Sequence, residues 1–531
     1  MNVFAMARRI TKKHALEYLC VAALLCMGLH LVFERCAHRE MPSGDEGSWL
    51  SVAAELSRGH GFSTHWLEYQ FQKPYMLPRP DDFRYPGLTL LLAAAFKMAG
   101  VSYPVALRTC ALIFACFCLA VYCTVRKVFG VATALLTLSA MTFSLNQLQW
   151  NSVVYSEGLF GLVLAATVYL SISLDARGKQ WWIAMGAAIG FLSLVRPNGI
   201  LLAAGLAWQY LRMRSLRAPG AVPFRYAAYA VCALIAVMLP WFMRNTLFFG
   251  NPLHIAGGAG LLQRSFQEPV NESFFAFIRS AGIFFPIKAT LTGAPGFIKI
   301  LNTFEHGLCV PLLCFAAIGF FQRRRFFNPF VLAGFCVTFV FCCYAAYKSY
   351  AGVRYFSAFL PFVYAYGIHA VVSTINRVPW ASRHVWVRYG AAAFIGASFL
   401  APVAYPHRYY ERVYAKRPNI DMDFSGHLST LNSLLSKGDS YFAGRLGQLN
   451  FLSEYNCVGV QEDFDSSLAQ RSLCAFKPKL LALTDEEANT RRFTDFIGLA
   501  RLNGCMVDQR AKTSFGVYYS LKRPAAPERR P

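Results

Sequence analysis

Two neighbouring carboxylates begin a helical pattern shortly after the first apolar run of the chain. Asp45 and Glu46 stand in "MPSGDEGSWLSVAAELSRGHGF", residues 41–62. If a helix begins at Asp45, the side chains four, seven, eight and eleven positions later are apolar and share one face. Such a helix would lie on a membrane surface with both acids in its first turn, free to act as bases. Asp45 could instead be an N-cap, because aspartate is favoured at that position.

A second acid stands at the end of another apolar run. Glu157 lies in "QWNSVVYSEGLF", where the third predicted span emerges on the same side as Asp45. A carboxylate at the end of a spanning helix is costly unless it is solvated or paired, so it is a candidate for function. The alternative is a solvated helix start, where a negative charge is favourable.

Basic residues also occur at predicted outer helix ends, against the usual trend. They are Arg84, Arg196, Arg244, Lys348 and Arg354. Each could extend toward the interface or pair with a lipid headgroup. Together, and opposite two acids, they predict a site for an anionic group, and arginine suits phosphate geometry.

A carboxylate beside a cationic phosphate pocket fits one reaction in particular, glycosyl transfer from a lipid-phosphate sugar. The base would deprotonate an acceptor hydroxyl, which attacks the anomeric carbon. The cationic side chains would stabilise the departing lipid phosphate as its charge develops.

The elements that must position these residues are membrane helices. The chain has 531 residues, of which 56% are hydrophobic and 15% charged, whereas soluble domains carry about a quarter charged residues. The net charge of +24 arises largely in short loops between apolar runs, which is typical of a cytoplasmic face and excludes a nucleic-acid surface. The first run, residues 15–33, follows four basic residues and is predicted to be a retained signal anchor.

The basic loops predict about eleven spans, with the N-terminus cytoplasmic and the C-terminus outside. Residues 86–100 are too short to span, at ~22 Å against a ~30 Å hydrocarbon core, and predict an interfacial or re-entrant helix. The membrane is expected to be a bacterial inner membrane. The predicted spans are residues 15–33, 105–125, 131–149, 158–174, 181–195, 199–211, 226–243, 307–321, 329–347, 355–373 and 389–405.

The chain divides into two predicted domains. Residues 1–404 form the membrane domain, with long outer loops at residues 34–84 and 249–305, and residues 405–531 form an extracytoplasmic α/β domain with a disordered tail. Its predicted strands are residues 440–444, 457–461, 479–484 and 515–521, and its predicted helices are residues 427–435, 466–476 and 490–502.

Cysteine usage gives no sign of a metal centre. Twelve of the 16 cysteines lie in apolar runs, where they act as small hydrophobic residues. Cys457, Cys474 and Cys505 lie in the C-terminal domain and could form one disulfide, whose pairing stays open. The two acids could hold a divalent cation, but no ligand spacing demands one, so no cofactor is predicted.

The ordered set of motifs resembles the C-type membrane glycosyltransferases (GT-C), the superfamily of protein O-mannosyltransferases and of the aminoarabinose transferase of lipid A. The resemblance covers residues 1 to about 405, and the small outward α/β domain also occurs in relatives. The motifs are "GDEGSWLSVAAELSRGHGF", "RYPGLTLLLAAAF", "VYSEGLFGLVLA", "LVRPNGILL", "PWFMRNTLFFGNP" and "RYFSAFLPF".

The resemblance implies a role for each matching residue. Asp45 would be the catalytic base, and Glu157, where relatives more often have aspartate, would position the acceptor or hold a metal. Arg84 and Arg354 would hold the lipid phosphate, and Lys348 is a further candidate. A basic residue common in relatives three positions after the acid is replaced here by Ser48, which weakens a specific aminoarabinose assignment. The supporting residues would be Glu46, Arg196 and Arg244.

The sequence therefore predicts an inverting glycosyltransferase that uses a polyprenyl-phosphate sugar on the extracytoplasmic face. The acceptor stays open between a protein, a lipid and a glycan. Two rival hypotheses remain. A transporter or flippase would be expected to show internal repeats, which are not seen. A surface-polysaccharide polymerase or ligase shares the lipid-linked donor but not the early acid followed by "RYPGL".

Overall fold

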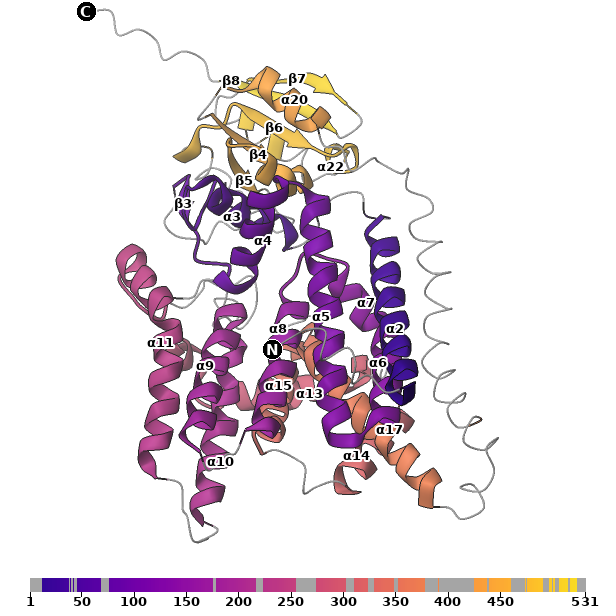
Figure 1. Cartoon of the computed structure of the whole chain (residues 1–531). Coiled ribbons are helices and arrows are strands. Elements are labelled where there is room, and N and C mark those ends of the chain that lie inside the picture. The colour runs from indigo at the N-terminus through magenta and orange to yellow at the C-terminus, as the bar shows by residue number, and fades with distance from the viewer. Residues whose placement is uncertain are drawn as a thin grey trace, which may run out of the picture. The chain divides into compact units, whose positions relative to one another are not determined.

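Most described residues are helical in the computed structural model of the protein, as the apolar runs predict (Figure 1). The structure describes residues 12–37, 45–67, 76–174, 178–215, 223–254, 274–301, 310–322, 329–347, 352–377, 425–436, 439–459, 475–489, 506–513 and 516–522, with a few isolated residues between them. The predicted span at residues 389–405 and the predicted tail lie outside this part of the chain, as does most of the predicted helix at residues 466–476.

The chain forms two compact units that do not follow chain order. The helical unit comprises Met1–His38, Cys110–Leu253 and Gly258–Pro418. The sheet unit comprises Arg39–Thr109, His254–Gly257 and Asn419–Pro531. The first predicted outer loop is thus grouped with the C-terminal residues, while the domain boundary at residue 404 stays a prediction.

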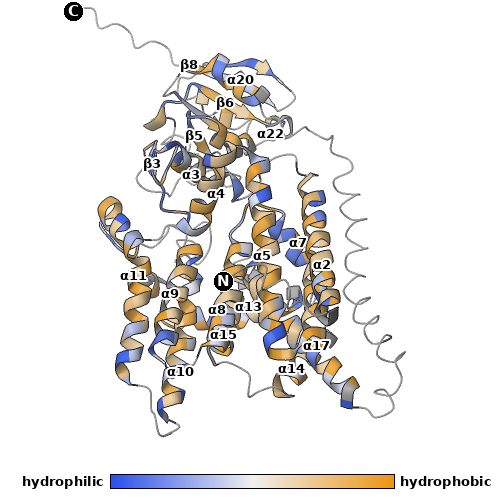
Figure 2. Cartoon of the chain, in the orientation of Figure 1, coloured by the Kyte–Doolittle hydropathy of each residue, from blue (hydrophilic) through white to orange (hydrophobic). Residues whose placement is uncertain are grey.

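The helical unit consists of long apolar helices and their short breaks, and in Figure 2 these helices are coloured mostly as hydrophobic residues. Their bounds are α2 (Lys12–Ala37), α5 (Tyr103–Phe129, whose first turns belong to the sheet unit), α6 (Val131–Phe143), α7 (Leu145–Asn151), α8 (Glu157–Ser173), α9 (Lys179–Val195), the 3₁₀ helix η1 (Pro197–Leu202), α10 (Ala203–Ser215), α11 (Phe224–Phe249), α12 (Phe274–Ala281), α13 (Phe285–Leu301), α14 (Val310–Gln322), α15 (Pro329–Tyr347), α16 (Gly352–Phe356), the 3₁₀ helix η4 (Ser357–Phe359) and α17 (Leu360–Arg377).

Four helical segments of the described chain are long and apolar enough to cross a membrane. They are Ala15–Ala37, Tyr103–Phe129, Phe224–Phe249 and Arg354–Ile375. A fifth span arises if α6 and α7, which are bent by 60° at Ser144, are counted together. Helices α4 (Pro86–Ala99) and α8 are apolar but shorter. The protein is an integral membrane protein, and the total of about eleven spans stays a prediction.

Glycine lets the helices of the helical unit approach closely. A Cβ atom on Gly186 of α9 would lie 2.0 Å from the carbonyl oxygen of Ala230 in α11. The same separation applies to Gly293 of α13 and the carbonyl of Cys343 in α15. Small residues at such contacts are typical of helix pairs in membranes. Helix α13 lies inside the region predicted as an outer loop, and the hydropathy pattern missed it because glycine and proline interrupt its apolar run.

The sheet unit contains a six-stranded mixed sheet in the order β2-β5-β4-β6-β8-β7. The first four strands are parallel, and β8 pairs antiparallel with both β6 and β7. Bounds in this unit are α3 (Glu46–Arg58), β1 (Ser63–Thr64), β2 (Trp66–Leu67), β3 (Arg79–Pro80), α4, α20 (Ser425–Leu434), β4 (Ser440–Ala443), the 3₁₀ helix η5 (Arg445–Leu452), β5 (Asn456–Gly459), β6 (Leu480–Leu483), α22 (Asp485–Ala488), β7 (Met506–Lys512) and β8 (Val517–Lys522).

The four predicted strands correspond to β4, β5, β6 and β8, while β7 and β2 were not predicted. Strand β2 comes from the first outer loop and pairs Trp66 with Cys457 and Leu67 with Val458. Leu67 is fully buried in the core of the sheet. Cys457 is a free buried thiol, and Cys474 and Cys505 lie outside the described residues.

Helix α3 is covered by other parts of the protein, whereas the sequence predicted that it lies on a membrane surface. All residues from Glu46 to Glu55 are buried, and the helix packs against α4 and η5 within the sheet unit. It therefore lies among protein elements rather than on a membrane surface. The pattern of apolar residues could not show this, because η5 comes nearly 400 positions later in the chain.

His427 of α20 makes the stability of the sheet unit sensitive to acid. Its side chain is buried, Nδ1 lies 2.7 Å from the Tyr518 hydroxyl, and burial lowers its pKa to about 4. Between pH 6.5 and 4, His427 binds a proton in the unfolded chain but not in the folded chain. Its contribution to the free energy of unfolding is therefore fully present above pH 6.5 and decreases as the pH falls through this window. The shift corresponds to about 3 kcal/mol.

We expect His427→Gln to remove this part of the pH dependence. Thermal unfolding of wild type and variant at pH 7, 5.5 and 4.5 would measure it, with the difference between the two proteins isolating His427 from other groups. Equal loss of stability on acidification in both proteins would contradict the prediction.

Candidate active site

Asp45 immediately precedes α3, but its carboxylate does not cap the helix. The residue takes the N-cap position without a side-chain cap hydrogen bond. Instead, its Oδ1 accepts a hydrogen bond from Nη2 of Arg84 at 3.3 Å. The Asp45 side chain is 19% exposed, whereas that of Arg84 is 6% exposed. The carboxylate is thus accessible and paired with a cation, and the N-cap hypothesis does not account for it.

Arg84 is held in place from several sides within the sheet unit. Its Nε donates to the Ser48 hydroxyl at 2.7 Å, and its guanidinium lies over the rings of Trp49 and Phe83. Ser48 stands at the position where the sequence resemblance led us to expect a basic residue. Here the Ser48 hydroxyl accepts a hydrogen bond from Arg84. A neutral side chain at this position therefore helps to hold the Arg84 guanidinium in place.

The backbone just before Arg84 forms a turn that is stabilised by the side chain of Asp81. The carboxylate of Asp81 accepts from the backbone N–H groups of Phe83 and Arg84, at 3.2 and 2.8 Å. Burial raises the pKa of Asp81. Pro86 follows at the first turn of α4, where proline is favourable. These local interactions direct Arg84 toward Asp45.

The predicted site residues did not include Arg79, Asp81, Asp82 or His254. Asp82 pairs with Arg79, and its Oδ2 lies 2.9 Å from Nε2 of His254. The doublet Asp81–Asp82 beside Arg84 was a visible signal, whereas His254 comes from a loop about 170 positions later and gave none.

Glu46 has a different environment from its neighbour. It is fully buried, pairs with Arg39, and accepts a hydrogen bond of 3.0 Å from the Tyr103 hydroxyl. Arg39 also donates to that hydroxyl at 2.8 Å. Glu46 therefore connects α3 to the start of α5, while the supporting role predicted for it stays a prediction.

In the helical unit, Glu157 forms ion pairs with two of the predicted arginines. Its Oε1 lies 2.6 Å from Nη1 of Arg196 and 3.2 Å from Nε of Arg354. Glu157 begins α8, Arg196 directly follows the last residue of α9, and Arg354 lies in α16. The Glu157 side chain is buried, and the guanidinium groups lie over Tyr355, with Arg354 also over Tyr155. Glu157 is therefore a paired carboxylate rather than a solvated helix start.

Of the two remaining predicted cations, Arg244 lies among the described residues and Lys348 does not. Arg244 in α11 lies over Trp241, Phe248 and Phe249, and it donates to the side chain of Asn245 at 3.2 Å. The supporting role predicted for Arg244 stays a prediction.

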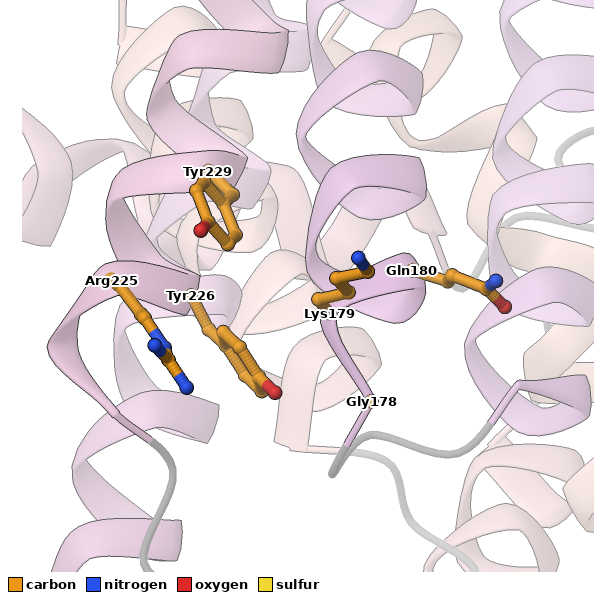
Figure 3. Close-up of a pocket in the computed structure, with 6 residues that line it drawn as sticks. All are labelled: Gly178, Lys179, Gln180, Arg225, Tyr226 and Tyr229. Atoms are coloured by element: carbon orange, nitrogen blue, oxygen red, sulfur yellow. The ribbon is translucent and has the colours of Figure 1, made fainter.

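A pocket of about 560 Å³ in the helical unit lies away from Glu157. Figure 3 shows it between the first turns of α9 and α11, lined by Lys179, Arg225, Tyr226 and Tyr229 among others. Lys179 begins α9, and Arg196 directly follows its last residue. Because α9 is 17 residues long, its two ends lie ~25 Å apart. The pocket is therefore not the site that contains Glu157.

Comparisons with known proteins bear on this fold. The sequence model of the dolichyl-phosphate-mannose-protein mannosyltransferases matches residues 79–241. The crystal structure of ArnT from Cupriavidus metallidurans bound to undecaprenyl phosphate superimposes with a TM-score of 0.61 at 13% identity, over 94% of this chain and 97% of that one. The chain has the GT-C fold.

A second GT-C structure supports the same conclusion. The oligosaccharyltransferase AglB from Archaeoglobus fulgidus, in complex with an inhibitory peptide and a dolichol-phosphate, matches with a TM-score of 0.55 at 12% identity, over 97% of this chain and 75% of that one. A search of curated protein sequences found no match. The predicted GT-C fold with its C-terminal sheet is confirmed, and residues 79–241, which carry Arg84, Glu157 and Arg196, resemble a family of mannosyltransferases.

Proposed function

We propose that the protein transfers a sugar from a polyprenyl-phosphate donor to an acceptor hydroxyl, with inversion, on the extracytoplasmic face of a bacterial inner membrane. The observation that carries this proposal is the accessible Asp45 carboxylate, which is engaged with Arg84 instead of capping α3. The polyprenyl phosphates bound in the ArnT and AglB structures supply the class of donor.

Asp45 is the general base of the proposed reaction. Its carboxylate takes the proton of the acceptor hydroxyl while the oxygen forms a bond to the anomeric carbon. The bond from that carbon to the donor phosphate oxygen breaks, and its electron pair leaves with the polyprenyl phosphate. Attack opposite the leaving group inverts the configuration at the anomeric carbon.

Arg84 stabilises the leaving phosphate. A guanidinium binds phosphate oxygens through two parallel N–H donors, and its hydrogen bonds strengthen as negative charge develops. In the structure, Arg84 pairs with Asp45. A donor phosphate competes for this guanidinium and leaves the carboxylate available to the acceptor.

Glu157 and Arg354 have a second role in the proposal. Arg354 is more exposed than Arg196, at 23% against 9% of the side chain, so it is the arginine of this pair that is offered to a phosphate. The buried Glu157 carboxylate holds both guanidinium groups in fixed positions. The acceptor is a hydroxyl of a protein, a lipid or a cell-envelope glycan.

Binding of undecaprenyl phosphate tests the phosphate part of the proposal. We expect Arg84→Ala to weaken binding by ~10- to 100-fold, because hydrogen bonds to charged groups contribute about 1.5–3 kcal/mol each. Native mass spectrometry of the full chain in nanodiscs would measure the dissociation constant. The matched control is Arg108→Ala, which removes an exposed arginine from the same unit. Equal affinities of the two variants would overturn the assignment of Arg84.

A further inference from the structure

The end of α3 brings together three side chains that can act as metal ligands. Glu55 Oε2 lies 2.8 Å from Nδ1 of His60 and 3.4 Å from Nε2 of His65. The three ligand atoms all lie within 4.8 Å of one another. Glu55 is buried and His65 half-buried, whereas the His60 side chain is 49% exposed.

The backbone accounts for this convergence. Helix α3 ends at Gly59, whose φ of +90° lies in the left-handed region that glycine adopts readily. The chain therefore turns back, and the His60 N–H donates to the Glu55 carbonyl at 3.0 Å. The His65 carbonyl in turn accepts from the Cys457 N–H at 2.8 Å, which anchors it beside β5.

The separations suit a small tetrahedral ion. With metal–ligand bonds of ~2.0–2.1 Å, the ligand atoms of a tetrahedral zinc site lie ~3.3 Å apart. The contacts of Glu55 with the two histidines fall on either side of this value, so small side-chain rotations would complete the geometry. Two imidazoles and one carboxylate form a recognised zinc ligand set that leaves a fourth position for water.

One further contact points to a ligand rather than to a simple ion pair. The Asn456 side-chain oxygen lies 3.1 Å from Nδ1 of His65. This oxygen accepts a hydrogen bond from Nδ1–H, which orients the imidazole so that Nε2 faces Glu55. Metal-binding histidines are typically oriented by a hydrogen bond of this kind.

The Glu55 carboxylate divides its two oxygens between different partners. Arg58 occupies Oε1 at 2.6 Å, so Oε2 is the oxygen that faces both imidazoles.

We propose that Glu55, His60 and His65 bind one Zn²⁺ ion, which fixes the end of α3 to the loop that leads into β2. The site is distinct from the Asp45–Arg84 pair at the other end of α3. The sequence showed no such spacing, because the three residues follow at intervals of five, which no standard zinc motif uses.

Zinc content of the full chain tests the proposal. The protein would be purified in detergent with an affinity tag that lacks histidine, stripped with EDTA, and titrated with Zn²⁺. Elemental analysis gives the stoichiometry, and thermal unfolding gives the shift on zinc binding. The variants are His60→Gln and His65→Gln, with Asn456→Ala for the orienting contact. The matched control is His254→Gln, which removes an imidazole that lies 2.9 Å from the Asp82 carboxylate in the same unit.

We expect wild type and His254→Gln to bind about one Zn²⁺ per chain and to gain thermal stability from it. Asn456→Ala should weaken zinc binding by ~10- to 100-fold, and each ligand variant by more. His60 is exposed, so His60→Gln should fold normally and keep the test decisive. Failure of wild type to bind zinc, equal affinity of wild type and His60→Gln, or loss of zinc only in His254→Gln would overturn the proposal.

Discussion

Asp45→Asn is expected to reduce glycosyl transfer by ~100- to 10,000-fold, the range that a positioned general base contributes. Asparagine has nearly the same shape and can still accept a hydrogen bond from Arg84, but it cannot take the proton of the acceptor. Cells that carry the variant should accumulate the unused donor. Mass spectrometry of lipid extracts, at equal protein levels, would detect one polyprenyl-phosphate sugar that wild type consumes and would identify the sugar.

The control for this experiment is Asp439→Asn. It also removes a carboxylate paired with a cation in the sheet unit, since Asp439 lies 2.7 Å from Nζ of Lys479. Its lipid profile should match wild type. An unchanged profile in Asp45→Asn, together with normal surface glycans, would reject Asp45 as the base and favour the transporter hypothesis instead.

Glu157→Gln is expected to lower both activity and stability. The substitution removes the negative charge beside Arg196 and Arg354, and loss of one partner from a buried ion pair costs about 3–5 kcal/mol. Because Arg354 would no longer be held in place, we expect turnover per folded molecule to fall ~100-fold, a loss typical of removing a group that stabilises the transition state. Turnover in proteoliposomes and thermal unfolding of the same preparation would measure the two effects.

The helical unit offers a matched control in Glu17 of α2. Its buried carboxylate pairs with Arg126, at 2.5 Å, and accepts from the Tyr122 hydroxyl. Glu17→Gln should therefore destabilise the protein to a similar extent while leaving turnover per folded molecule close to that of wild type. Equal losses of turnover in the two variants would mean that Glu157 serves stability alone.

The pattern of apolar residues was sufficient for most of the helices. Helices α2, α5, α8, α9, α11 and α15 lie where apolar runs predict them, because a membrane helix satisfies its own backbone and needs only a long apolar segment. Likewise, β4, β5, β6 and β8 lie within a few residues of their predicted positions, since each is a short apolar run between turn residues.

The candidate site could be predicted only in part. The sequence indicated Asp45, Arg84 and Glu157 as individual residues, because an acid or a base at a helix end is visible locally. It could not show that Asp45 pairs with Arg84 instead of capping α3, since the two hypotheses differ only in the direction of one side chain.

By itself, the sequence determined the membrane class, the apolar helices, the C-terminal strands and the charged groups available for chemistry. These features depend on composition and on the spacing of neighbours. The tertiary structure decided which of those groups meet: Arg196 and Arg354 on Glu157, β2 beside β5, and two histidines on Glu55. Each of these contacts depends on where the backbone turns and on which distant segment packs against it. Neither the turns nor the packing partners can be predicted from the hydropathy of the chain.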